Sequence, residues 1–249
     1  MTVAAGQAPL SRVGGDALAL LRRRLDQCEA EGVGILCCPE ALIGGLADWA
    51  DDRSSAAIPS SGILRFLRPV AGARLTVIVG FTELSSDGGL YNSAAVVSHG
   101  TLTGVYRKRH PSIRRSVYRP GTESPVFQAD GMCFGILICY DSTFLNLGAD
   151  LASRGARVLF VPTNNALPAS RASNTLLAEV RACDASLATE NGCWVVRADV
   201  AGVAGELRSE GSSCITSPSG KTVSTGRPFE EDFLVAELGL LCAHRSKAK

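Results

Sequence analysis

Residues 132–144 read MCFGILICYDSTF, an apolar stretch that predicts a strand with Cys139 near its end. A helix-like segment, 145–154, follows it, and a second apolar strand, ARVLFVPTN, begins at Ala156. This order of strand, helix and strand is typical of α/β proteins. The sheet of such a protein aims the residues at the ends of its strands, and the loops that follow form the cleft. Cys139 is therefore a candidate reactive residue.

The same alternation extends towards both ends of the chain. Apolar residues at helical spacing predict helices over 14–31, 59–72 and 168–191. YNSAAVVSHG and TLTGVYRKRH predict a hairpin that turns at His99–Gly100. The mixture predicts one α/β domain over 1–249, with a mixed sheet or two packed sheets and helices outside. The other predicted strands are GVGILCCPE (32–40), RLTVIVGFTEL (74–84), CWVVRADVAG (193–202), GSSCITSPSG (211–220) and FLVAEL (233–238).

The composition argues against several classes of protein. Of the 249 residues, 20% are charged and the net charge is +1, whereas a nucleic-acid binder usually carries a basic excess. No apolar run approaches the roughly 18 residues that a membrane span needs, and the N-terminus lacks the pattern of a secretory signal. We therefore expect a cytoplasmic protein with neither a nucleic-acid partner nor a membrane partner.

The nine cysteines do not predict disulfides or a zinc site. Their number is odd, and most of them lie inside apolar runs, as buried thiols do in a reducing cytosol. The sequence contains no CxxC pair, and its three histidines are far apart. We therefore expect no metal site and reduced thiols.

Glu40, Lys108 and Cys139 each stand at the end of an apolar strand. A thiol has a pKa of about 8.5, so it needs a base or a nearby positive charge before it can attack. A buried glutamate can accept its proton, and a lysine can stabilise the oxyanion that forms. Taken singly, each residue also fits a structural role as a core cysteine, a capping glutamate or a solvated lysine.

Five segments occur in the order expected of one known family. They are VAAGQ (3–7) with GVGILCCPEALIGG (32–45), GLYNSAAVVSHGTLTGVYRKRH (89–110), GILICYDSTF (135–144), TENGCWVVRADVAG (189–202) and GSSCITSPSGKTVS (211–224). Together these segments resemble the nitrilase, or carbon–nitrogen hydrolase, superfamily along nearly the whole chain.

The resemblance implies a four-layer αββα sandwich with two mixed β-sheets, assembled as a homodimer or a larger homo-oligomer. It also implies a catalytic set of Glu40, Lys108 and Cys139 that hydrolyses a small-molecule amide through a thioester, without metal or cofactor. The backbone N–H of Tyr140 would help Lys108 to hold the oxyanion. The string CYD, which ends at Asp141, is commoner among the amidases of the family than among its true nitrilases.

Substrate-binding residues follow less directly. We expect Tyr140, Asn164 and Asn165 to line the pocket, together with the loop over 110–120. Many members of the family carry a second glutamate between the lysine and the cysteine, but no acidic residue occurs here between Lys108 and Glu123. A substrate with its own negative charge, met by Arg114 or Arg115, would fit that difference. Two further departures are STFLN after CYD, where RFPE is frequent, and Leu187 in place of the arginine of RAxEN.

Three alternatives remain open from the sequence. The same triad could hydrolyse an N-carbamoyl group or a nitrile instead of an amide. The chain could also be a non-catalytic binding protein that retains the fold. A cysteine–histidine hydrolase with His110 as the base is the third, although His110–Pro111 already begins the loop.

Overall fold

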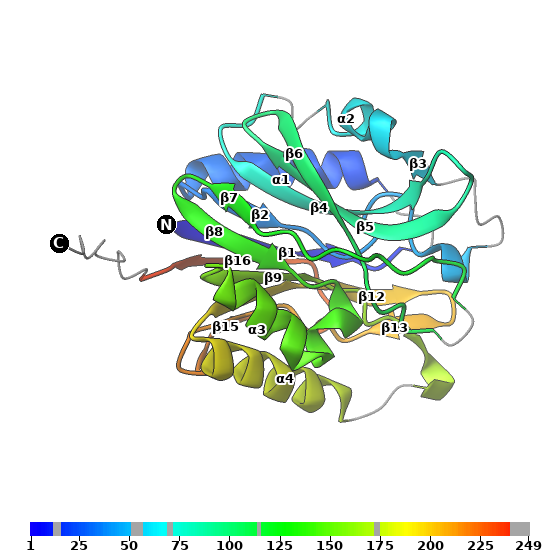
Figure 1. The fold of residues 1–249 in the computed structure, drawn as a ribbon. Coiled ribbons are helices and arrows are strands. Elements are labelled where there is room, and N and C mark those ends of the chain that lie inside the picture. The colour runs from blue at the N-terminus through cyan, green and yellow to red at the C-terminus, as the bar shows by residue number, and fades with distance from the viewer. Residues whose placement is uncertain (12–15, 51–56, 69–71, 114–115, 172–174, 240–249) are drawn as a thin grey trace.

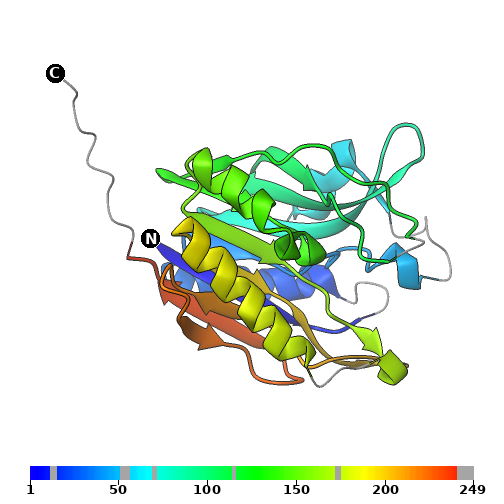
Figure 2. The ribbon, with the colours of Figure 1, turned by 60° about the horizontal axis from the view of Figure 1, so that its bottom comes forward.

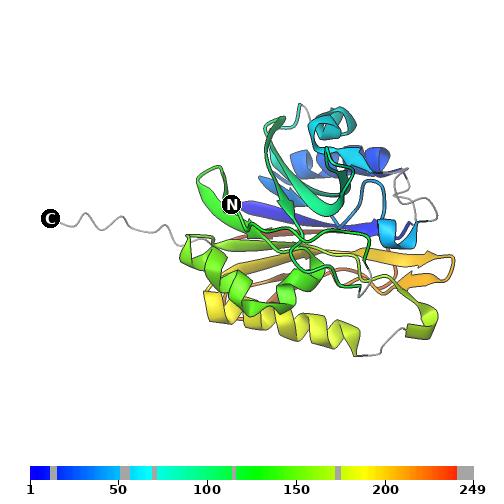
Figure 3. The ribbon, with the colours of Figure 1, turned by 45° about the vertical axis from the view of Figure 1, so that its right-hand side comes forward.

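The computed structural model describes residues 1–11, 16–50, 57–68, 72–113, 116–171 and 175–239. Within these ranges two mixed β-sheets pack face to face, and helices cover the outer face of each sheet (Figure 1). The view in Figure 3 shows the two sheets between the helices. The predicted four-layer αββα sandwich with two mixed sheets is confirmed.

The larger sheet has ten strands in the described part of the chain, in the order β10-β13-β12-β1-β2-β4-β5-β6, with β16 beside β1 and β3 beside β4. Its central strands β1, β2 and β4 are parallel, whereas β4, β5 and β6 form an antiparallel meander. The bounds are β1 Thr2–Pro9, β2 Ile35–Cys37, β3 Ile58–Pro59, β4 Thr76–Leu84, β5 Leu90–Ser98, β6 Thr101–Arg107, β10 Leu167–Pro168, β12 Val200–Ala204, β13 Leu207–Ser209 and β16 Asp232–Glu237.

The smaller sheet has six strands in the same described ranges, in the order β15-β14-β11-β9-β8-β7. Its strands are β7 Phe127–Ala129, β8 Met132–Ile136, β9 Val158–Pro162, β11 Trp194–Ala198, β14 Cys214–Thr216 and β15 Thr222–Thr225. The α-helices are α1 Ala17–Ala30, α2 Ile63–Phe66, α3 Leu145–Ser153 and α4 Leu176–Asn191. Figure 2 shows α3 and α4 side by side on one outer face. No helix of the described residues is long and apolar enough to cross a membrane.

Three apolar clusters fill the spaces between the four layers. One lies between the larger sheet and helices α1 and α2, the second between the two sheets, and the third between the smaller sheet and helices α3 and α4. Neighbouring residues of one strand point into different clusters, as the two-residue period of a strand requires. On β2, for example, Leu36 packs under the helices while Ile35 and Cys37 face the other sheet.

The hairpin at His99–Gly100 is confirmed, and both turn residues have positive φ. The helix predicted over 168–191 ends where expected, with Gly192 in the left-handed region at φ 60°, but α4 begins only at Leu176. The helix predicted over 59–72 is wrong in extent. A 3₁₀ turn at Ser60–Gly62 leads into a single turn of α-helix, Ile63–Phe66, and residues 69–71 lie outside the described ranges.

The apolar run 193–202 is not one strand, contrary to our prediction. It divides into β11 in the smaller sheet and β12 in the larger one. Asp199 stands at the break and is fully buried, and its carboxylate accepts backbone N–H groups from Asn165, Val200 and Ser212 at 2.8–3.0 Å. These hydrogen bonds give the three backbone N–H groups an acceptor at the point where the chain passes from one sheet to the other.

Gly80 allows β4 to pass close to the segment that carries Glu40. A Cβ atom at this position would lie 2.3 Å from the carbonyl oxygen of Pro39 and 2.8 Å from Cα of Glu40. Both atoms belong to the backbone, which cannot move aside as a flexible side chain can.

We expect Gly80→Ala to lower the free energy of unfolding by about 1–3 kcal/mol, because the added methyl group overpacks this contact. Urea denaturation followed by circular dichroism measures the change. Gly72→Ala is the matched control, since nothing lies within 4 Å of a Cβ atom there. Equal stability of the two variants would contradict the close packing at Gly80.

Candidate active site

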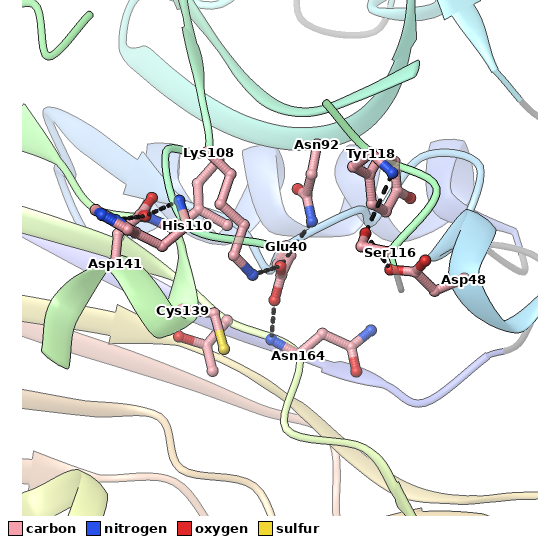
Figure 4. Close-up of polar contacts among 12 residues, drawn as sticks. Glu40, Asp48, Asn92, Lys108, His110, Ser116, Tyr118, Cys139, Asp141 and Asn164 are labelled. Atoms are coloured by element: carbon pink, nitrogen blue, oxygen red, sulfur yellow. Dashed lines mark hydrogen bonds and ion pairs between the residues drawn. The ribbon is translucent and has the colours of Figure 1, made fainter. Parts of the chain in front are cut away.

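Glu40 follows β2 and its side chain is buried, with 2% of its surface exposed. Its backbone N–H donates to the carbonyl of Thr163 at 3.2 Å. The carboxylate accepts from Lys108 Nζ at 2.5 Å and from Asn92 Nδ2 at 2.7 Å on Oε1, and from the backbone N–H of Asn164 at 2.9 Å on Oε2 (Figure 4). Three donors therefore fix its position and leave little freedom of rotation.

Lys108 follows β6 directly and is as buried as its partner, with 3% of its surface exposed. Its backbone N–H donates to the carbonyl of Asn92 on the neighbouring strand β5 at 2.8 Å. Burial by itself would lower the pKa of Lys108, but the negative charge of Glu40 at hydrogen-bond distance raises it overall. The lysine is therefore a permanent cation at neutral pH.

We predicted Cys139 inside a strand, near its end, but the structure places it just after the strand. β8 ends at Ile136, and Cys139 opens a 3₁₀ turn over Cys139–Thr143 with a positive φ of 47°. A left-handed conformation at a residue other than glycine costs on the order of 1 kcal/mol, and such strain clusters at active sites. The turn is held by Ser142, whose hydroxyl donates to the carbonyl of Cys139 at 2.7 Å.

The thiol of Cys139 is partly exposed and donates to Oδ1 of Asn165 at 3.5 Å. Burial of the sulfur and the charge of Glu40 raise the pKa of Cys139 to about 12, although the charges of Lys108 and Arg197 lower it. At neutral pH the resting group is therefore a thiol that must lose its proton during the reaction. The arrangement suits a general base beside the sulfur more than a preformed thiolate.

Asp141 joins the lysine segment to the cysteine turn. Its fully buried carboxylate accepts from the Tyr106 hydroxyl at 2.7 Å, from the backbone N–H of His110 at 2.8 Å and from that of Ile138 at 3.2 Å. Tyr106 and His110 flank Lys108, and Ile138 precedes Cys139. One carboxylate thus fixes the end of β6 against the nucleophile, which explains the aspartate of the CYD string.

His110 is directed towards this carboxylate. Its Nδ1 lies 3.1 Å from Oδ1 of Asp141, and its ring stacks on Phe144 with the ring centroids 3.7 Å apart. His110 is not among the described residues that line the cavity around Cys139. The geometry therefore does not favour the cysteine–histidine alternative.

A cavity of about 320 Å³ opens above the three predicted catalytic residues. The predicted binding residues Tyr140, Asn164 and Asn165 all line it, whereas Arg114 and Arg115 lie outside the described residues. Glu123 is exposed and is not part of the described lining. Further lining residues are Leu46, Asp48, Trp49, Asn92, Pro111, Ile113, Ser116, Tyr118, Leu176, Glu179, Val180, Cys183 and Arg197.

Several of these residues were missed in the sequence. Asn92 is quoted in the YNSA string, and the hairpin register brings it beside Lys108, so its role could have been inferred from strand pairing. Arg197 is a charged residue inside the apolar run CWVVRADVAG, which signals a buried and paired cation. Asp48 has no such signal. Its carboxylate accepts from Ser116 Oγ at 2.9 Å and from the backbone N–H of Val117 at 2.8 Å, which fixes the 116–117 segment beside the cavity (Figure 4).

Comparison with known proteins agrees with the sequence motifs. A family model described as carbon-nitrogen hydrolase matches residues 2–241. A nitrilase from Pyrococcus abyssi (strain GE5 / Orsay) is 34% identical over 74% of this chain and 67% of its own length. An N-carbamoylputrescine amidase from Oryza sativa subsp. japonica is 27% identical over 96% of this chain and 86% of its own.

Solved structures share the fold at lower identity. A mutant amidase from Nesterenkonia sp. AN1, with acrylamide added to its active-site cysteine, superimposes with a TM-score of 0.78 at 21% identity and covers 96% of this chain and 93% of its own. The family match extends over nearly the whole sequence and the fold agrees with it. This protein is therefore an enzyme of the carbon–nitrogen hydrolase family.

Proposed function

We propose that this enzyme hydrolyses an amide of a small molecule through a thioester on Cys139, with Glu40 as the base and Lys108 as the fixed positive charge. The observation that carries the proposal is the buried ion pair of Glu40 and Lys108, which opens onto the same cavity as the Cys139 thiol. An ion pair of this kind is expensive to bury, and its position beside a thiol gives it a chemical use.

The proposed reaction has four steps. Glu40 accepts the thiol proton while the sulfur attacks the carbonyl carbon. The oxyanion is held by Lys108 and by the backbone N–H of Tyr140. The C–N bond then breaks, and Glu40 returns the proton to the departing ammonia or amine. Finally, Glu40 removes a proton from water, which attacks the thioester and releases the acid and the free thiol.

The cavity supports a small and partly apolar substrate. Its volume of about 320 Å³ falls at the lower end of the range for small-molecule sites. Apolar side chains form part of its wall, among them Leu46, Trp49, Ile113 and Val180. Glu40, Lys108 and Asn164 lie near Cys139, where the scissile bond would lie (Figure 4).

A second candidate reaction is the hydrolysis of an N-carbamoyl group. It is favoured by the similarity to the rice N-carbamoylputrescine amidase, which extends over 96% of this chain. A panel of primary amides, N-carbamoyl amines and nitriles separates the candidates. An amide releases ammonia and the acid, a carbamoyl compound releases carbon dioxide and the amine as well as ammonia, and a nitrile passes through a thioimidate.

We expect Cys139→Ala to abolish turnover, by at least about a thousandfold, because the proposed thioester forms on this sulfur. Ammonia release from the best substrate of the panel measures the loss, and circular dichroism checks that the fold is intact. Cys183→Ala is the matched control, since Cys183 also lines the cavity but donates its S–H to the carbonyl of Ser142. Full turnover by Cys139→Ala would remove this residue from the mechanism.

The raised pKa of the Cys139 thiol predicts a distinctive pH profile. Only the thiolate reacts with methyl methanethiosulfonate, and its fraction rises about tenfold per pH unit below the pKa. Because this pKa is raised to about 12, the rate of labelling at Cys139 should still rise between pH 8 and pH 10. A free thiol with a pKa of about 8.5 levels off in that range.

Mass spectrometry of peptides from wild-type and Cys139→Ala protein identifies the site that is labelled. A plateau of the Cys139 rate below pH 9 would show that the pKa of this thiol is not raised and would contradict the predicted pH profile.

A further inference from the structure

Arg197 is a charged residue near the end of strand β11, and only 2% of its surface is exposed. A buried charge needs a partner, and Arg197 has one in Asp184 of helix α4, which is fully buried. The guanidinium donates to the carboxylate through Nη2 at 2.5 Å and through Nε at 2.9 Å. The pairing is bidentate, the geometry in which arginine binds a carboxylate most firmly.

The remaining donors of Arg197 reach the two segments that carry the proposed nucleophile and base. Nη2 donates to Ser142 Oγ at 3.0 Å, and that hydroxyl donates to the carbonyl of Cys139 at 2.7 Å. Nη1 donates to Thr163 Oγ1 at 2.8 Å, and the carbonyl of Thr163 accepts the backbone N–H of Glu40 at 3.2 Å. The guanidinium of Arg197 is thus linked to Cys139 through one residue, Ser142, and to Glu40 through one residue, Thr163.

The charge of Arg197 also acts on the sulfur. Four charged groups influence Cys139: Glu40 and Asp199 oppose its ionisation, whereas Lys108 and Arg197 favour it. Lys108 and Arg197 act on the sulfur from opposite sheets, and each is paired with a carboxylate, Glu40 and Asp184 respectively. Asp184 and the thiol of Cys214 face Arg197 itself, while Asp141 and Cys183 face the turn that carries Cys139.

We propose that Arg197 is a positioning residue for the hydrolysis. Through Ser142 it holds the strained turn that carries Cys139, through Thr163 it steadies the segment of Glu40, and its positive charge favours the thiolate as the thiol proton leaves. This inference rests on the proposed function for its catalytic meaning, but its effect on the sulfur does not depend on turnover.

The test compares three variants with the wild type. Arg197→Gln combined with Asp184→Asn removes both charges together and leaves polar side chains of similar size. Arg197→Lys keeps the charge but loses the planar fork. Arg157→Gln is the control, because Arg157 is an exposed arginine just before β9 that does not line the cavity.

Two readouts separate the role of the charge from the role of the geometry. We expect the neutral pair to lower kcat at least tenfold with less than a threefold change in KM. We also expect it to lower the rate at which methyl methanethiosulfonate labels Cys139 at pH 9 by about tenfold. Arg197→Lys should lower kcat similarly yet keep the labelling rate within about twofold. Arg157→Gln should match the wild type in both.

Ser142→Ala provides a milder second variant should the neutral pair fail to fold. It removes the hydrogen bond from the Ser142 hydroxyl to the carbonyl of Cys139. We expect it to lower kcat about fivefold in the wild-type background. In the Arg197→Lys background it should cause no further loss of kcat. Equal losses in both backgrounds would overturn the proposed path through Ser142.

A folded neutral pair with wild-type kcat and a wild-type labelling rate would overturn the proposal for Arg197. If no amide, carbamoyl compound or nitrile is turned over even by the wild type, the proposed function fails. The labelling rates of Cys139 then still decide whether Arg197 acts on the sulfur.

Discussion

The structure depends on one buried ion pair, formed by Lys108 and Glu40. Lys108 and Glu40 meet at 2.5 Å with almost no exposed surface, although 68 residues separate them in the chain. Removing one partner of such a pair typically costs about 3–5 kcal/mol, because the other charge is left without compensation. The surroundings therefore have to hold both groups, and Asn92, Asn164 and the backbone around Thr163 do so. The geometry around the cavity therefore depends on holding this pair.

The smaller sheet also carries buried charged groups that are held by hydrogen-bond partners. Arg197 and Asp184 form a second buried pair below the cysteine turn, and the carboxylates of Asp141 and Asp199 are surrounded by N–H and O–H donors. Each of these groups contacts a segment that carries a lining residue. The polar interior therefore runs from Glu40 to Cys139, and apolar clusters lie beside it.

The motifs in the sequence predicted the family, the layers of the fold and the approximate place of each of the three polar residues. Local patterns succeeded where local physics decides the structure, as in the turn at His99–Gly100 and the helix end at Gly192. They failed in the run 193–202, because its apolar composition is the same on both sides of Asp199 and only the pairing of distant strands divides it. The contacts of Asp48 and Arg197 likewise arise from segments far away in the chain, which no local pattern encodes.

The described parts of the site come from both sheets, and this has a consequence for folding. Glu40 and Lys108 follow strands of the larger sheet, whereas Cys139 and Arg197 belong to the smaller one. Neither sheet alone carries both Glu40 and Cys139. The pocket that these residues line is therefore complete only when the two sheets have docked against each other.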